Sequence, residues 1–159
     1  MKKFVKYLLW LALLALIVIQ FFRPEKNQAG YEAVAAFEAE TRPGDAVRGI
    51  LKENCYDCHS NHTNYPWYAE IAPVSFWLDD HVRHGKGDFN VSDWESYSAK
   101  KKDHKLEELI EEVKGGHMPL DSYTWVHGDL TDEEKDLLLQ WATVARMQLR
   151  SELEVSVTD

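Results

Sequence analysis

The chain has 159 residues, enough for one modest domain with short extensions. Its composition is that of a globular protein, although six Trp and seven Tyr are many for this length. Residues 1–23 hold four of the 18 basic residues and none of the 27 acidic ones, so the remainder carries 14 basic and 27 acidic residues. Because an acidic domain repels phosphate groups, DNA and RNA are excluded as partners.

The N-terminus carries an uncharged apolar run over residues 7–22, which follows three lysines and ends before Arg23. Its length is near the lower limit for a membrane-spanning helix, and the same pattern is found in signal peptides. No small-x-small cleavage pattern follows it directly, so we predict an uncleaved signal-anchor transmembrane helix within residues 1–23. Lysines before the span predict a single-pass protein of a bacterial inner membrane, with the rest of the chain in the periplasm.

The polar segment that follows, residues 24–43, is predicted to be a tether with a short helix in its Ala-rich part. Asp45 is expected to cap a helix that runs toward Cys55. We place the main domain at residues 44–150 and a flexible tail at residues 151–159.

Later stretches show the apolar period of helices. Val74, Trp77, Leu78 and His81 share a face of a helix that starts near Pro73, and Gly85 and Gly87 are expected to end it. A second stripe, ended by Gly115-Gly116, contains Leu106, Leu109, Ile110 and Val113. Thr131 and Glu134 match a capping box before the last helix, whose apolar face is predicted to be Leu137, Leu138, Trp141, Val144 and Ala145. Residues 117–129 are expected to form an ordered loop. Since no strand pattern is present, we predict an all-α fold with long ordered loops.

The two cysteines lie in Cys55-Tyr56-Asp57-Cys58-His59, which is the C-x-x-C-H attachment signature of c-type haem. Two intervening residues let both thiols reach one edge of a porphyrin and form thioethers with its vinyl groups. The next residue, His59, then lies beneath the iron and ligates it. The motif therefore predicts one covalently bound haem c held by Cys55, Cys58 and His59.

This cysteine pair has three other interpretations. A redox disulfide of thioredoxin type requires a β-α-β context, which the sequence does not show. A closed zinc site requires four ligands, and the chain has no further cysteine. A plain structural disulfide is the third alternative.

The sixth iron ligand is predicted to be Met118, in Gly115-Gly116-His117-Met118-Pro119. Met and His form a recognised axial pair that raises the potential of an electron-transfer haem, and glycines permit close approach to a flat ligand. His117 is the second candidate and His81 the third. The remaining histidines lie in polar stretches and are predicted to be surface residues, namely His62, His84, His104 and His127.

The chain resembles the small haem-binding-domain family of c-type cytochromes over residues 44–142. The shared residues are Asn54 to Asn61, Tyr65-Pro66-Trp67-Tyr68, Ile71 to Ser75, Met118-Pro119-Leu120 and Tyr123-Thr124-Trp125. The resemblance implies a single-haem protein with a cytochrome c-like helical arrangement, Cys55 and Cys58 as covalent links, His59 as proximal ligand and Met118 as distal ligand.

These features together predict a membrane-anchored carrier of single electrons that exchanges them with membrane or periplasmic redox proteins and is not an enzyme. Two alternatives keep the haem: a peroxidase, or a sensor of a small gas, either of which needs a labile sixth ligand. A third alternative is a haem-free interaction domain with one disulfide. The sequence leaves the oligomeric state open.

Overall fold

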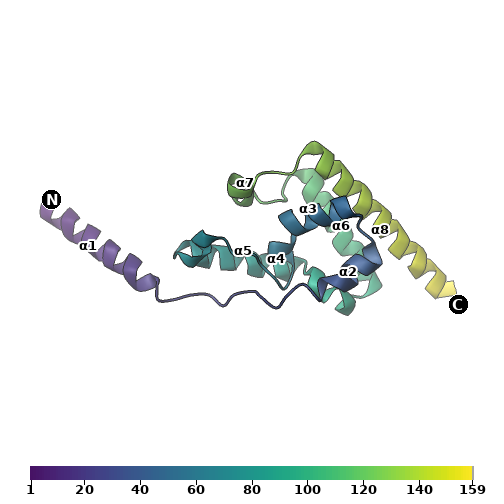
Figure 1. Cartoon of the computed structure of the whole chain (residues 1–159), viewed down its shortest axis with the longest axis horizontal. Coiled ribbons are helices and arrows are strands. Elements are labelled where there is room, and N and C mark those ends of the chain that lie inside the picture. Colours follow the sequence, from purple (N-terminus) through teal and green to yellow (C-terminus); the bar gives the residue numbers. More distant parts are fainter. Residues whose placement is uncertain (159) are drawn as a thin grey trace.

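A computed structural model describes residues 1–158, in which helices are joined by loops (Figure 1). It contains no strand within the described residues, and one isolated bridge joins Gln28 to His62. This agrees with the all-α prediction. The α-helices are α1 (Lys2–Ile19), α2 (Val34–Thr41), α3 (Asp45–Asn54), α4 (Tyr56–His59), α5 (Val74–Asp88), α6 (Ala99–Gly115), α7 (Asp121–His127) and α8 (Asp132–Thr158); the 3-10 helices are η1 (Trp67–Glu70) and η2 (Val91–Ser96).

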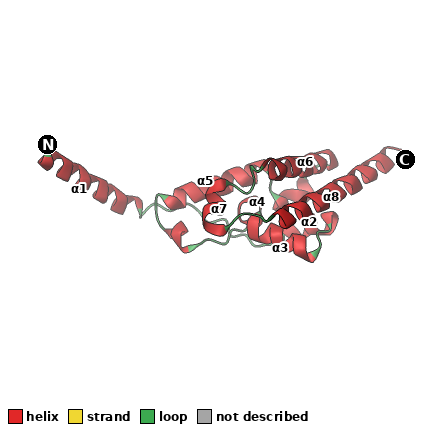
Figure 2. Ribbon diagram, turned by 90° about the horizontal axis from the view of Figure 1, so that it is seen from above, coloured by secondary structure: helices red, strands yellow, loops and turns green. Residues whose placement is uncertain are grey.

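The N-terminal helix α1 projects away from the other helices and buries none of its residues (Figures 1 and 2). Three of its first five residues are lysines, so its uncharged part covers only Tyr7 to Ile19. Thirteen residues at about 1.5 Å each give about 20 Å, against about 30 Å of hydrocarbon. Among residues 1–158, no helix has both the length and the apolar character needed to cross a membrane.

This finding corrects two predictions. The transmembrane helix in the predicted fold is wrong, because the lysines fall inside the helix and it ends at Ile19. The predicted location, a single-pass protein of a bacterial inner membrane with a periplasmic haem domain, depended on that helix and is corrected with it.

The centre of the core is formed by aromatic residues from three elements, α2, η2 and α8. The Phe37 ring packs edge-on against Trp94 at 4.9 Å and against Trp141 at 5.9 Å between ring centroids. Both indoles have partners: Trp94 Nε1 donates to Glu40 and Trp141 Nε1 donates to the Thr41 carbonyl, each at 2.9 Å. Burial of these large rings is the main driving force that joins the elements.

Helices α6 and α8 pack side by side as the longest pair in the main body (Figure 2). The α6 stripe is buried at Leu106 and Val113. On α8 the buried residues are Leu138, Trp141, Ala142, Ala145 and Leu149. Leu137 and Val144, which were predicted to face the core, are exposed, because the stripe of α8 is rotated toward Ala142 and Leu149.

Three predicted boundaries also change. α5 continues through Gly85 and Gly87 to Asp88, since a glycine inside a helix costs only about 1 kcal/mol. The predicted loop over residues 117–129 contains α7. Gly44 occupies the cap position of α3, and Asp45 is its first helical residue. The predicted tail over residues 151–159 includes Asp159, which lies outside the described residues, and its flexibility stays a prediction.

Candidate functional site

The C-x-x-C-H motif forms a single helical turn. α3 ends one residue before Cys55, and in α4 the backbone N–H of His59 donates to the Cys55 carbonyl at 2.9 Å. Residues three and four positions apart on a helix share a face, so this turn presents Cys55, Cys58 and His59 together. Tyr56 is buried, and its hydroxyl donates to Glu38 Oε1 at 3.0 Å, which fixes α4 against α2.

The His59 ring is oriented by the chain that follows α5. Its Nδ1 lies 2.8 Å from the Phe89 carbonyl, and a carbonyl only accepts, so Nδ1 carries the hydrogen and Nε2 keeps its lone pair. Burial lowers the pKa of His59, although the carbonyls of Phe89 and Gly85 partly oppose this. A neutral imidazole whose other nitrogen is held by a backbone carbonyl is the usual form of a metal-ligating histidine.

Both cysteines are free thiols. Burial, together with the neighbouring Cys58, raises the pKa of Cys55 to about 12. Burial and the Asp57 carboxylate raise the pKa of Cys58 to about 11. The two groups are therefore S–H at neutral pH. A redox pair of thioredoxin type has a lowered pKa, so this environment disfavours that reading.

A cavity of about 340 Å³ lies between the C-x-x-C-H turn and helices α6 and α8. Cys55, His59 and Met118 line it together, although they come from different parts of the fold. This volume is within the range of ligand pockets in proteins. Most of its other lining is apolar and includes Phe37, Leu51, Phe89, Leu109, Val113 and Leu138.

Met118 reaches this cavity because α6 ends in a tight reversal. Gly116 adopts a left-handed conformation (φ 72°), and the backbone N–H groups of His117 and Met118 both donate to the Glu112 carbonyl, at 2.9 and 3.2 Å. Met118 is half-buried against the core. The His117 side chain is 72% exposed, with its Nδ1 3.3 Å from Glu112 Oε2, and it does not line the cavity. The geometry thus favours Met118 over His117, while the ligand role itself stays a prediction.

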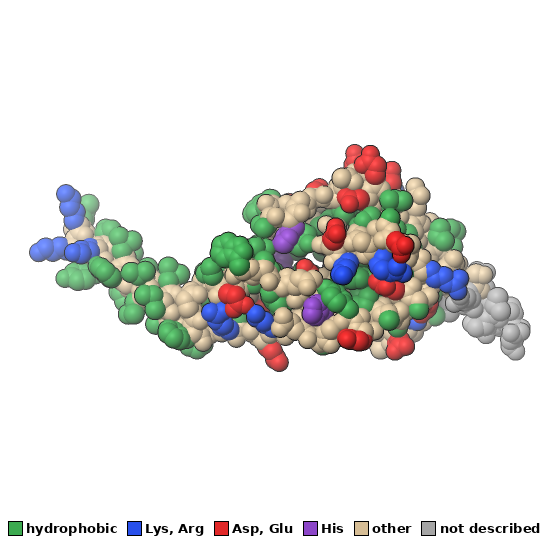
Figure 3. Space-filling model, in the orientation of Figure 1, with side chains coloured by type: hydrophobic (Ala, Val, Ile, Leu, Met, Phe, Trp, Pro, Cys, Tyr) green, Lys and Arg blue, Asp and Glu red, His purple; other side chains and the backbone are tan. Residues whose placement is uncertain are grey.

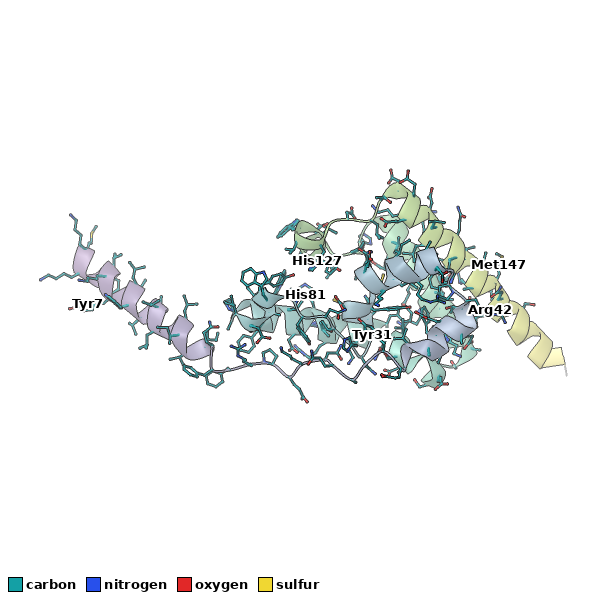
Figure 4. All side chains as sticks on the ribbon, viewed as in Figure 1. Tyr7, Tyr31, Arg42, His81, His127 and Met147 are labelled. Carbon is teal, nitrogen blue, oxygen red and sulfur yellow. The ribbon has the colours of Figure 1, made fainter. Side chains whose placement is uncertain are left out.

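A second cavity, of about 80 Å³, lies between α4, α5 and α7. Cys58 lines this one, with Trp77 and His81 from α5 and Tyr123 and His127 from α7. Figure 4 shows His81 and His127 on either side of the space between these helices. His81 therefore stands beside the second cysteine and does not line the cavity of His59.

Sequence reasoning missed the side chains that hold α7 in place. The Tyr123 hydroxyl donates to the Glu53 carbonyl at 2.6 Å, and its ring stacks on His127 at 4.3 Å. His127 is exposed, as predicted. Its Nε2 nevertheless has a hydrogen-bond partner, the Tyr68 hydroxyl at 2.8 Å. The spacing of Tyr123 and His127, four residues apart, was the available signal, because it places both rings on one face of a helix.

The segment predicted to be a tether is instead bound to the loop after His59. The Asn27 amide donates to the Ser60 carbonyl at 2.9 Å and to Thr63 Oγ1 at 3.0 Å, and its oxygen accepts from Lys86 Nζ at 2.7 Å. Its backbone N–H donates to the Tyr65 hydroxyl at 2.8 Å. No sequence signal points to Asn27, because its partners lie more than 30 positions away. These hydrogen bonds cross residue 44, where the haem-binding domain was predicted to begin.

A helical domain with a one-turn C-x-x-C-H helix, a half-buried histidine of lowered pKa and an apolar cavity beside both has the features of a haem protein. A family model described as a haem-binding domain matches residues 14–144, and the chain belongs to this family. The match begins upstream of residue 44 and includes the segment that holds the loop after His59. No curated protein and no solved structure matches the chain, and the cytochrome c-like arrangement stays a prediction.

The residues present fit a haem. The large cavity offers apolar walls for a porphyrin, and the Nε2 lone pair of His59 is available to the iron. The Cys55 thiol lines this cavity, and Cys58 follows one helical turn on, at the second cavity. The chain is therefore a haem-binding protein.

Proposed function

We propose that the chain is a c-type cytochrome that carries single electrons, with one haem attached covalently. The observation that carries the proposal is that one cavity is lined by Cys55, by His59 with its Nδ1 already bound to a carbonyl, and by Met118. Bound haem supplies one-electron chemistry through the Fe(II)/Fe(III) couple. In this proposal Cys55, Cys58, His59 and Met118 would hold the haem and set its redox potential.

Attachment uses the two thiols. Cys55 and Cys58 would hold the haem through thioethers: addition of each S–H to a vinyl group would form one carbon–sulfur and one carbon–hydrogen bond and would need no external oxidant or reductant. Cys55 and Cys58 are protonated, as this balance requires. Lys105 lines the same cavity and offers an ammonium group to a haem propionate.

His59 and Met118 are the residues that would ligate the iron of a bound haem. The hydrogen bond from His59 Nδ1 to the Phe89 carbonyl holds the ring and makes Nε2 a better donor. A thioether is soft and uncharged, so the half-buried Met118 suits a ligand that favours the reduced iron. With both positions filled by protein groups, no open site remains for a substrate, so we propose an electron carrier and not an enzyme. Its partners are then other redox proteins.

The test is the absorption spectrum and midpoint potential of the full chain, expressed with a haem-attachment system, for wild type and Met118→Ala. We expect a low-spin wild type whose oxidised form shows the weak far-red band of iron–methionine bonding. Met118→Ala loses this band, and its potential falls by roughly 0.2 V, within the range of about 0.8 V that axial ligands span.

His117→Ala is the matched control, because its side chain is exposed and does not line the cavity. It should leave both spectrum and potential unchanged. A high-spin wild type that binds carbon monoxide when reduced would contradict the proposal and favour a peroxidase or a gas sensor. A low-spin wild type that lacks the band and becomes high-spin in His117→Ala but not in Met118→Ala would transfer the ligand role to His117.

A further inference from the structure

Large apolar side chains around the second cavity are exposed to solvent. We call them the aromatic rim: Trp67 on η1, Trp77 on α5, and Trp125 and Val126 on α7, which are 77%, 49%, 82% and 64% exposed. Trp77 and Val126 line the cavity itself, and Trp67 packs edge-on against Tyr68, which also lines it. Three exposed tryptophans around one cavity are more than scattered surface residues account for, and such patches mark interaction sites.

The rim lies next to an attachment cysteine. Cys58 lines the second cavity together with Trp77 and Val126, so the second thiol and two residues of the rim border the same cavity. On the other side, Cys55 faces the large cavity and the buried core. Of the two cysteines, Cys58 is thus the one beside an exposed apolar surface.

The rim is fixed before any partner arrives. Tyr123 and His127 tie α7 to α3 and η1 through hydrogen bonds of 2.6 Å to the Glu53 carbonyl and 2.8 Å to the Tyr68 hydroxyl. Trp125 lies between these two anchors in the same helix. A preformed surface loses little conformational entropy on binding, which suits brief encounters.

The surroundings of α7 are acidic. Residues 121–136 contain six acidic residues and one lysine. That lysine, Lys135, pairs with Asp129 at 3.5 Å, so the excess stays negative. Figure 3 shows acidic side chains gathered where α8 begins, close to α7. At η1, by contrast, Glu70 is neutralised by Arg23 and Lys26.

We propose that the aromatic rim is the docking surface for a basic redox protein, which stacks apolar groups on Trp125 and Trp77 and meets the acidic residues of 121–136. The inference rests on the proposed electron-carrier function and deepens it by assigning the partner's side and charge. Interfaces of electron-transfer encounters are small, so a few exposed rings suffice. Opposite charge speeds and orients the encounter. Anionic lipid is disfavoured, because the acidic flank repels it.

The experiment maps binding directly. Reduced, ¹⁵N-labelled holoprotein is titrated at low salt with the basic cytochrome c of heart muscle, and amide shift changes are recorded. We expect the changes to cluster in residues 67–68, 74–81 and 121–128. Trp125→Ala should weaken binding about tenfold, as for a central interface tryptophan. Binding should weaken as salt is raised, because screening removes the charge attraction.

Met147→Ala is the matched control, since Met147 is 58% exposed but lies on α8, away from the rim (Figure 4). It should bind as wild type does. Shift changes elsewhere, or equal weakening in Trp125→Ala and Met147→Ala, would overturn the proposal. So would flotation with phosphatidylcholine vesicles that is lost in Trp125→Ala, because the rim would then be a lipid-binding surface.

A redox titration with small mediators tests the electron-carrier function separately from the docking surface. A reversible one-electron wave with no binding at the rim refutes the docking surface alone. No reversible wave refutes the electron-carrier function, whatever the map shows.

Discussion

Gly85 is the residue at which α5 touches the C-x-x-C-H turn. A Cβ at this position would lie 2.7 Å from the Cys58 carbonyl oxygen and 3.1 Å from the Cys58 Cβ. The first contact is with backbone, which cannot rotate away, so α5 and α4 would have to separate. Gly85→Ala is therefore expected to lower the free energy of unfolding by about 1–3 kcal/mol. Denaturant unfolding of the holoprotein measures this, and a haem stain reports the yield of attached haem, which should also fall.

Gly87, two residues further along the same helix, is the control. Nothing lies within 4 Å of a Cβ built there. Since alanine is the better helix former, Gly87→Ala should stabilise the protein by up to about 1 kcal/mol and leave haem attachment unchanged. Equal effects of the two substitutions would show that the close approach of Gly85 to Cys58 does not matter.

Between elements, Asp103 joins α6 to α8. Its Oδ1 accepts from Arg146 Nε at 2.7 Å and from Arg150 Nε at 2.9 Å. Burial acts to raise the pKa of Asp103, but the two guanidinium groups outweigh it and hold the pKa below its ordinary value. A depressed carboxyl pKa stabilises the fold above the unfolded value, about 3.9, and the effect is lost as pH falls through the folded value.

Asp103→Asn is accordingly expected to cost about 1–2 kcal/mol in the free energy of unfolding at pH 7. The difference from wild type should shrink as pH falls below about 4, because Asp103 of the unfolded chain then takes up a proton that native Asp103, with its lowered pKa, does not. Urea unfolding at several pH values measures both. Asp136→Asn, an exposed α8 variant, should show no such pH dependence. A penalty that stays constant to pH 3 would contradict the assigned role of Asp103.

The elements that sequence predicted well are those whose signals are local. The apolar stripe of α6 and the Gly116 that ends this helix lie within one short segment of sequence. The Thr131–Glu134 capping box also forms as predicted, with the Glu134 N–H donating to Thr131 Oγ1 at 3.2 Å. α7 was missed because seven residues make a marginal helix without the distant anchor at Glu53. The end of α5 was predicted too early because Gly85 lies inside the helix and serves contact with Cys58, which no local pattern shows.

The residues of the candidate site likewise fall into those with a local sequence signal and those without one. The cysteines and His59 are readable because haem attachment fixes their spacing within five residues. The Phe89 carbonyl that orients His59 and the Asn27 amide that holds the following loop are 30 or more positions away, so only the fold brings them together.

At the scale of the whole molecule, the N-terminal region consists of two unlike parts. α1 buries no residue, and Gln20, just after it, bonds to the backbone of Ala72. Residues 24–33 form a strap across the haem-attachment side, with Asn27 bonded to Ser60, Thr63 and Lys86 and Ala29 N–H bonded to the Asn61 carbonyl. The strap therefore belongs to the folded domain, whereas α1 contributes little to its stability.

Two deletions test this division. Removal of residues 1–19 keeps Gln20 and the strap and should change the Tm of the holoprotein by less than about 3 °C. Removal of residues 1–30 eliminates several hydrogen bonds of about 1 kcal/mol each, so the Tm should fall by roughly 5–10 °C. Asn27→Ala in the full chain should reproduce part of that loss. If both deletions melt alike, the strap does not support the site; if removal of α1 alone is as costly, α1 packs on the domain in a way that its exposed side chains do not show.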